Sequence, residues 1–296
     1  MSGSSLDGLD IVFTHLEESR GAWKFEIRNC DCIPYDEEWL KALKTVKTNS
    51  VTDYLLLHTR YGKYLAECVN AFIEKHSLHH QIDFIATHGH TVFHDPANNT
   101  STQIGCGATL AALTQLPVVS DLRAMDVALG GQGAPIVPVG DKLLFTEYDY
   151  CLNIGGIVNI SVKKEDEIQA FDVCTGNQAL NILAQREGKE MDKNGEMARQ
   201  GTLLAGVLSQ LNNQEYLRQP PPKSLSNEAA QQLVFPAMNQ SEHDVKDLLH
   251  TLVTHIAEQV RDVAAQYRSE KEIVHMLITG GGAFNSFLVE KITEVL

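Results

Sequence analysis

The stretch that decides the fold is Leu152-Asn153-Ile154-Gly155-Gly156-Ile157-Val158-Asn159-Ile160. Its apolar residues form two short runs on either side of the Gly pair, and we interpret these runs as two short strands. A Gly pair between apolar strand residues indicates a bulge or a close approach of another group to the backbone. A phosphate group would explain such an approach, and a simple hairpin turn is the alternative.

The residues on the N-terminal side of this stretch alternate between helical and strand patterns. Apolar residues recur every three or four positions from 52 to 75, which predicts an amphipathic helix, and a short apolar strand follows at 84–87. Because a helix followed by a buried strand and a polar loop is typical of α/β proteins, we assign the chain to that class. The other predicted elements are a hairpin of strands at 9–16 and 23–28, a helix at 108–115 and a strand at 117–120.

On the C-terminal side the same alternation continues. A strand is predicted at 168–173, with helical stretches at 177–211 and 242–267. Between the two helical stretches, Gln219-Pro220-Pro221-Pro222-Lys223-Ser224 predicts a stiff, extended loop. The last strand, at 274–279, runs into Gly280-Gly281-Gly282 and a helix that reaches residue 296, an arrangement that contacts nucleotides in many proteins.

Length and charge exclude several classes of protein. A chain of 296 residues suggests two domains. The 24 Lys and Arg residues against 38 Asp and Glu residues give a net charge of −14, which argues against binding to nucleic acid or to an anionic membrane. No apolar run approaches the roughly 18 residues of a spanning helix, and the first residues lack the basic and apolar regions of a signal peptide. The six Cys residues match neither a metal pattern nor a secreted disulfide framework, so we interpret them as reduced thiols of a cytoplasmic protein.

Small and acidic residues fill the segment from Ser2 to Asp10. Small side chains let backbone N–H groups approach a phosphate closely, and Asp7 and Asp10 are candidate ligands of Mg²⁺. The segment lacks the GxxxxGK[ST] pattern of a P-loop. A flexible turn is the alternative interpretation.

Two further groups of polar residues are candidates for contacts with a small substrate. Thr87-His88-Gly89-His90-Thr91 follows a strand, where ligands bind in α/β folds. Contacts with sugar hydroxyls, or plain hydrogen bonding within the loop, are favoured there over a zinc site formed by His88, His90 and His94. Arg123 could hold a carboxylate or an amide through its planar guanidinium, with a surface Arg–Asp network as the alternative.

Asp172 stands at the end of a predicted strand and directly before a predicted helix. A carboxylate in that position can act as a general base on a water molecule or a sugar hydroxyl. Thr175, Gly176 and Asn177 would offer hydrogen-bond donors at the start of the helix. The alternative is that Asp172 only caps the helix.

Together these segments resemble the 1,6-anhydro-N-acetylmuramic acid kinases, a family of the sugar kinase/Hsp70/actin superfamily. The resemblance runs in order through residues 1–10, 87–94, 121–138, 153–160, 171–177 and 280–285. It implies an α/β protein with two lobes of ribonuclease H-like fold around a central ATP cleft, and we place the lobes at residues 1–146 and 147–296. It also implies ATP and Mg²⁺ as cofactors and a homodimer in the cytoplasm.

The family opens the 1,6-anhydro ring of its amino sugar and phosphorylates O6, giving N-acetylmuramic acid 6-phosphate and ADP during recycling of peptidoglycan. Asp172 matches the catalytic Asp of the family, which activates the attacking water. The resemblance implies nucleotide-binding roles for Gly3, Ser4, Ser5, Leu6, Asp7, Gly8, Leu9, Asp10, Gly155, Gly156, Gly281, Gly282 and Asn285. The metal ligand would be Asp7, and the substrate-facing residues would be Thr87, His88, Gly89, His90, Arg123, Asp126 and Gln132.

This chain departs from the family pattern at three places. Many members read Asp-Thr-Gly-Pro where this chain reads Asp172-Val173-Cys174-Thr175, which changes the turn after the catalytic Asp. The family has a strand before the segment that begins at Ser2, and a strand and a helix after the triple Gly. We therefore expect a first lobe truncated at both chain ends, with an unpaired sheet edge. The alternatives to this sugar kinase are a kinase of the superfamily with another small substrate and a truncated, non-catalytic nucleotide-binding member.

Overall fold

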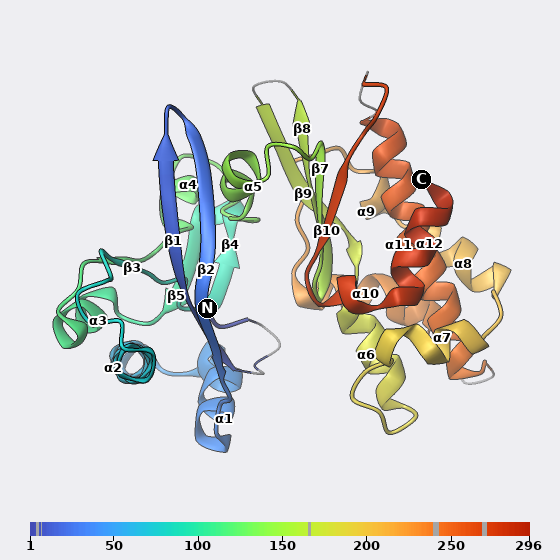
Figure 1. Ribbon diagram of the computed structural model, residues 1–296. Helices are drawn as coiled ribbons and strands as arrows, with labels where there is room; N and C mark the ends of the chain where they lie inside the picture. The colour runs from blue at the N-terminus through green and yellow to red at the C-terminus, as the bar shows by residue number, and fades with distance from the viewer. Residues whose placement is uncertain (4–5, 7, 165–166, 239–242, 268–270) are drawn as a thin grey trace. The chain divides into compact units, whose positions relative to one another are not determined.

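The computed structural model describes residues 1–3, 6, 8–164, 167–238, 243–267 and 271–296. The chain forms two compact units, Met1–Ile136 and Val137–Leu296 (Figure 1). This division falls before helix α5 (Pro138–Leu144), whereas the sequence placed it after that helix. Helix α5 belongs to the second unit because Asp141 accepts a hydrogen bond from Ser161 Oγ at 2.6 Å. In the described part of the chain no helix is both long and apolar enough to cross a membrane.

The first unit begins with a long antiparallel hairpin of strands β1 (Leu9–Ser19) and β2 (Ala22–Ile33), as the sequence predicted. Its turn is formed by Arg20 and Gly21, which both have positive φ, at 55° and 82°. Two further pairs of strands follow. Strands β3 (Ile85–Ala86) and β6 (Val118–Val119) are parallel, and strands β4 (His90–Asp95) and β5 (Thr100–Ile104) are antiparallel.

Helix α2 (Val51–His76) provides the largest share of the core of the first unit. Ser50 caps its N-terminus by accepting a hydrogen bond from the Asp53 N–H at 3.1 Å. The apolar stripe predicted at residues 52–75 is buried, and Tyr61 is fully buried within it. The other helices of this unit are α1 (Glu37–Thr45), η1 (Val46–Thr48), η2 (Pro96–Asn98), α3 (Gly107–Thr114) and α4 (Ala124–Ala128).

The second unit is built on one mixed sheet with the strand order β10-β7-β8-β9. The strands are β7 (Tyr150–Ile154), β8 (Ile157–Lys164), β9 (Glu167–Thr175) and β10 (Met276–Thr279). Strand β10 is parallel to β7, and β8 is antiparallel to both β7 and β9. Strands β7, β9 and β10 therefore run in the same direction, so their carboxyl ends meet at one edge of the sheet (Figure 1). That edge is where ligands bind in α/β sheets.

The long helix predicted at 177–211 is wrong, because the chain breaks there into several short helices. Gly188, Asn194 and Gly195 have positive φ, a conformation that ends a helix. The pieces are α6 (Asn177–Gln185), η3 (Lys193–Gly195), α7 (Glu196–Gln200) and α8 (Ala205–Asn212), and α9 (Glu215–Arg218) and α10 (Asn227–Met238) follow. The second predicted helix is confirmed as α11 (Val245–Gln266), whose Leu248, Leu252 and Ile256 are fully buried.

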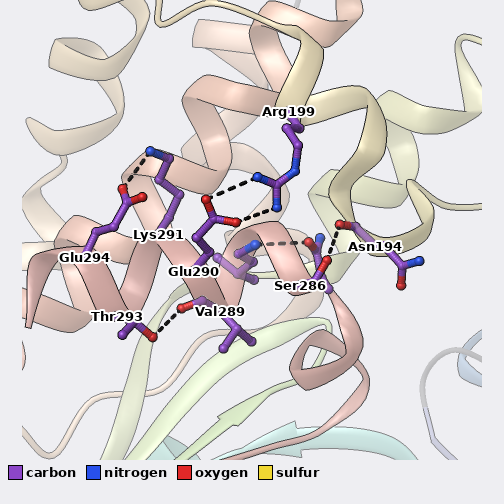
Figure 2. Close-up of polar contacts among 10 residues, drawn as sticks. Asn194, Arg199, Ser286, Val289, Glu290, Lys291, Thr293 and Glu294 are labelled. Carbon is purple, nitrogen blue, oxygen red and sulfur yellow. Dashed lines mark hydrogen bonds and ion pairs between the residues drawn. The ribbon is translucent and has the colours of Figure 1, made fainter.

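The C-terminal helix α12 (Ser286–Val295) is attached to the segment around α7 by polar contacts (Figure 2). Arg199 forms a two-pronged ion pair with Glu290, at 3.2 and 2.5 Å, and Ser286 Oγ donates to the Asn194 carbonyl at 3.1 Å. These contacts hold the N-terminus of α12, and with it η4 (Gly281–Phe284), at the end of strand β10.

Candidate functional site

The turn of Gly155 and Gly156 joins β7 to β8 and lies against the start of helix α6. The Gly156 carbonyl accepts from the Gly176 N–H at 2.9 Å, and the Gly155 carbonyl accepts from the Asn177 N–H at 2.9 Å. The idea that Gly176 and Asn177 offer free backbone donors to a ligand is therefore wrong, because these N–H groups are used by the turn. A Cβ on Gly156 would meet no atom closer than 3.7 Å, so the outer side of the turn is open to a ligand.

The Gly-rich segment after β10 packs directly against the same turn. Gly280 has a φ of 81°, and a Cβ there would lie 2.4 Å from Asn153 Oδ1. A Cβ on Gly282 would lie 2.1 Å from Ile154 Cγ2, so only Gly fits. Gly281 is exposed, whereas Asn285 caps α12 by accepting from the Leu288 N–H at 3.1 Å. The structure thus brings Gly155, Gly156, Gly281 and Gly282 together at one edge of the sheet.

Asp172 lies on β9, at a β-bulge. Asn159 on β8 is opposite Asp172, whereas the preceding residue of β8, Val158, is opposite Cys174. Val173 is therefore an extra residue without a partner, and such bulges re-aim side chains next to active sites. Asp172 remains partly exposed, while Val173, Cys174 and Thr175 are all buried.

Three hydrogen bonds hold Asp172 to the segment from Tyr216 to Leu225. The Tyr216 hydroxyl donates to the Asp172 carbonyl at 2.8 Å, and the Asp172 N–H donates to the Lys223 carbonyl at 3.1 Å. The Leu225 N–H donates to Oδ2 of Asp172 at 2.8 Å. The carboxylate is therefore held by a backbone group, and its orientation depends on this segment.

Lys223 fixes the shape of that segment. Its Nζ donates to the carbonyls of Tyr216 and Leu217 at 3.1 and 3.3 Å, and it lies 4.7 Å from the centre of the Tyr216 ring. Burial lowers the pKa of Lys223. The sequence predicted a stiff loop here, but it gave no sign that Tyr216, Lys223 and Leu225 support Asp172, because they lie more than forty positions away.

The two ends of the proposed phosphate-binding segment at the N-terminus pair with each other. Ser2 and Leu9 pair as a single antiparallel bridge, and the Asp10 N–H donates to the Met1 carbonyl at 2.9 Å. Gly8 lies against β2, because a Cβ there would be 2.7 Å from the Ile33 carbonyl oxygen. Gly3 and Leu6 are joined by a hydrogen bond from the Leu6 N–H to the Gly3 carbonyl at 3.3 Å. Ser4, Ser5 and Asp7 lie outside the described residues.

Three of the predicted substrate-facing residues form one network in the first unit. Arg123 Nε donates to Nε2 of His88 at 2.9 Å, and Arg123 Nη1 donates to the Gly133 carbonyl. The Gly133 N–H donates to Oδ2 of Asp126 at 2.6 Å. Burial, together with the positive charge of Arg123, lowers the pKa of His88.

The remaining predicted residues surround this network. Thr87 and Gly89 precede β4, and the Gly89 N–H donates to Thr87 Oγ1 at 3.3 Å. Gln132 is next to Gly133 and is partly buried. His90 is buried and points to Ser2 instead, with Nδ1 3.0 Å from Ser2 Oγ.

The structure does not support a zinc site at His88, His90 and His94. In the described ranges no group of three or more His, Cys, Asp or Glu side chains could hold a metal ion. The Nδ1 atom of His94 is instead 3.0 Å from Ser101 Oγ.

The family model described as anhydro-N-acetylmuramic acid kinase matches residues 1–296. The protein of that name from Francisella tularensis subsp. novicida is 32% identical over 318 residues, covering 100% of this chain and 83% of the relative. The one from Clostridioides difficile is 34% identical over 330 residues, covering 100% and 82%.

Among solved structures, a ROK family glucokinase from Streptomyces griseus in complex with glucose and AMPPNP has a TM-score of 0.40. It is 10% identical, and the match covers 96% of this chain and 88% of that chain. A likeness at this level assigns no ligand to this chain.

Two α/β units with Gly-rich turns at strand ends, together with these relatives, define a sugar kinase, which is a phosphotransferase. The chain belongs to the anhydro-N-acetylmuramic acid kinase family. The family predicted from the sequence is confirmed, as is the α/β class. The chain accordingly has a kinase role in the metabolism of this amino sugar.

Proposed function

We propose that the chain converts 1,6-anhydro-N-acetylmuramic acid, ATP and water into N-acetylmuramic acid 6-phosphate and ADP, within peptidoglycan recycling. Water attacks the anomeric carbon and the bond from that carbon to O6 breaks. O6 then forms a bond to the γ-phosphorus, and ADP leaves. The proton released by the water passes to Asp172. One catalytic carboxylate thus serves both ring opening and phosphoryl transfer, because the departing O6 is the phosphate acceptor.

The observation that carries this proposal is the position of Asp172 in a chain of this family. The carboxylate is partly exposed near the edge of the sheet where three strands end, and the Leu225 N–H fixes one of its oxygens. A general base needs a defined orientation and room for a water molecule, and this arrangement provides the orientation.

The nucleotide and the metal are proposed to use the Gly-rich turns and the N-terminal segment. The open side of Gly156 and the exposed Gly281 allow phosphate and adenosine groups to approach the backbone. Mg²⁺ in kinases takes one or two carboxylates and completes its coordination with phosphates and water. The exposed carboxylate of Asp10 fits that chemistry, and the bound ion would neutralise charge on the phosphates.

Arg123 is proposed to bind the carboxylate of the sugar's lactyl group. Its guanidinium is oriented by His88 and by Gly133, so it is positioned before a ligand arrives. The chain carries a net charge of −14, so an anionic sugar needs such a local cation. We also propose that the chain acts as a homodimer.

A product assay tests this function. The chain is incubated with MgATP and 1,6-anhydro-N-acetylmuramic acid, and we expect equal amounts of ADP and of a 6-phosphosugar by mass spectrometry. A parallel reaction with N-acetylmuramic acid, which has no anhydro bond, separates this function from an ordinary sugar kinase. Faster phosphorylation of that sugar, or ADP formation without any phosphosugar, would contradict the proposal.

A further inference from the structure

Four buried polar groups meet beneath the N-terminal segment of the first unit. Ser2 is 4% exposed and His90 is 7% exposed, and their Oγ and Nδ1 atoms are 3.0 Å apart. The hydroxyls of Tyr35 and Tyr61 are 2.6 Å apart, and both tyrosines are buried and lie close enough to Ser2 to interact with it. Buried polar groups are costly unless all of them are paired, so this cluster specifies one arrangement of its four residues.

The four residues come from separate parts of the unit. Ser2 belongs to the N-terminal segment, Tyr35 follows β2, Tyr61 is in α2, and His90 begins β4. Ser2 is also paired with Leu9 through the backbone bridge, so it stands where the two ends of the N-terminal segment meet. A contact on Ser2 therefore fixes the point where residues 1–3 meet Leu9 and Asp10.

His90 directly follows Gly89, whose carbonyl oxygen lies 3.2 Å from His88 Nδ1. His88 in turn accepts from Arg123. The Ser2–His90 contact thus connects the segment proposed for phosphate binding to the segment proposed for the sugar, entirely within the first unit. Burial lowers the pKa of His90 to about 4, so its imidazole is neutral near pH 7 and can accept a hydrogen bond from Ser2.

We propose that Ser2 and His90 are positioning residues, which hold the phosphate-binding segment in register with the sugar-facing segment through their hydrogen bond. This inference rests on the proposed function, and it removes His90 from the residues that touch the sugar. Neither side chain contacts a reacting atom. Both act through the backbone of the segment that begins with Gly3.

Steady-state kinetics provide the first test, with the variants Ser2→Ala, His90→Leu and their combination. Loss of one buried hydrogen bond is expected to raise the KM for ATP about tenfold, with less than about a twofold change in the KM for the sugar. The double variant should be no worse than either single variant, because both remove the same bond. His90→Asn should restore the KM for ATP, since its amide can place a hydrogen-bonding atom near the position of Nδ1.

The control is His76→Leu, which removes a partly buried His of the same unit. His76 bonds Asn29 and Asp31 at 3.1 and 3.0 Å, away from the cluster. It should lower thermal stability without changing the KM for ATP. A rise in the KM for the sugar alone in His90→Leu would overturn the inference, because His90 would then contact the sugar. A pattern identical to that of His76→Leu would also overturn it.

Hydrogen exchange gives a readout that does not need turnover. Peptides covering residues 1–10 of the ligand-free chain should exchange about tenfold faster in Ser2→Ala and His90→Leu, and unchanged in His76→Leu. If the parent chain has no activity but this acceleration is present, the proposed function fails and the positioning role stands. If exchange is unchanged in both variants, the positioning role fails whatever the activity.

Discussion

The Nε atom of Arg123 donates a hydrogen bond to Nε2 of His88 at 2.9 Å, which requires an unprotonated nitrogen at that position of the imidazole. The proton of the neutral ring is then on Nδ1, which lies 3.2 Å from the Gly89 carbonyl. His88 therefore orients Arg123, and Arg123 keeps His88 neutral. The orientation of the guanidinium and the protonation of the imidazole therefore depend on each other.

Replacing Arg123 by Lys tests whether this orientation serves the sugar. Lys lacks the planar guanidinium, so it cannot bond His88, Gly133 and a carboxylate together. We expect Arg123→Lys to raise the KM for the anhydro sugar about tenfold and to change the KM for ATP little. The control is Arg60→Lys, which affects an exposed Arg paired with Glu38. An unchanged KM for the sugar would exclude Arg123 from its binding.

Asp172→Asn should abolish turnover while nucleotide binding remains. The Asn side chain keeps one oxygen to accept from the Leu225 N–H, so the local structure is preserved, but it cannot take a proton. We expect kcat to fall by about a hundredfold to ten-thousandfold, the range typical of a lost general base. ATP binding, measured by calorimetry, should change by less than about twofold. Asp262→Asn, at an exposed carboxylate of α11, serves as the control, and retained turnover in Asp172→Asn would refute the role of the base.

Lys223 is predicted to support Asp172 from a distance. Lys223→Met removes both hydrogen bonds to the carbonyls of Tyr216 and Leu217, so the segment that holds the carboxylate should loosen. We expect kcat to fall about tenfold with an unchanged KM for ATP, the pattern of a lost positioning contact. Lys291→Met, at a partly exposed Lys paired with Glu294, should have no such effect. If the two Lys variants behave alike, Lys223 has no role in positioning.

Two Gly residues of the second unit should respond in opposite ways to replacement by Ala. In Gly282→Ala the new methyl group would lie 2.1 Å from Ile154 Cγ2, which should destabilise the unit by about 1–3 kcal/mol and raise the KM for ATP. In Gly206→Ala the methyl group meets nothing within 4 Å on helix α8, so a gain of roughly 0.5 kcal/mol is expected. Urea denaturation measures both changes, and equal stability of the two variants would show that the contact at Gly282 is unimportant.

Stability should fall below about pH 6.5. Burial lowers the pKa values of His90 and His255 from 6.5 to about 4 in the folded chain. Between these values the unfolded chain binds protons that the folded chain does not, so acid favours unfolding. Each residue adds a slope of up to about 1.4 kcal/mol per pH unit over that range. The free energy of unfolding, measured by urea denaturation, should differ less between pH 7 and pH 5 in His255→Gln than in the parent chain. His79→Gln, which changes an exposed His, should behave like the parent. If this difference in free energy is equal in all three proteins, burial of His255 does not cause the loss of stability in acid.

The sequence predicted the regular elements where the pattern was local. The stripe in α2 and the Gly turn between β7 and β8 are confirmed because 3.6-residue periodicity and Gly content need no knowledge of distant residues. The interruption of the helix after Gln185 was missed because residues 186–196 are rich in Arg, Glu and Lys, which favour helices, although Gly188, Asn194 and Gly195 have positive φ there.

The candidate site was predictable only in part, for a related reason. The Gly-rich turns follow strand ends, which sequence patterns can locate. Asp172, predicted at a strand end directly before a helix, instead lies inside β9, three residues before its end. The support of Asp172 by Tyr216 and Leu225, and that of Ser2 by His90, are contacts across 44, 53 and 88 positions. No periodicity encodes such pairings, so only the folded chain reveals them.

The bulge at Val173 has a consequence for how this gene can change. One additional residue separates the partners of Asn159 and Val158, which allows Asp172 to stay accessible while three successive residues after it are buried. Deletion of one residue there would restore regular pairing between β8 and β9. It would also move the side chains on one side of the deletion to the opposite face of the sheet. A substitution at one of these residues changes the packing by a small or large amount that depends on the new side chain. A change in the number of residues, in contrast, changes which face every following side chain occupies. Variation among functional descendants of this chain should therefore keep the spacing from Asp172 to Gly176 constant, even where the residues between them differ.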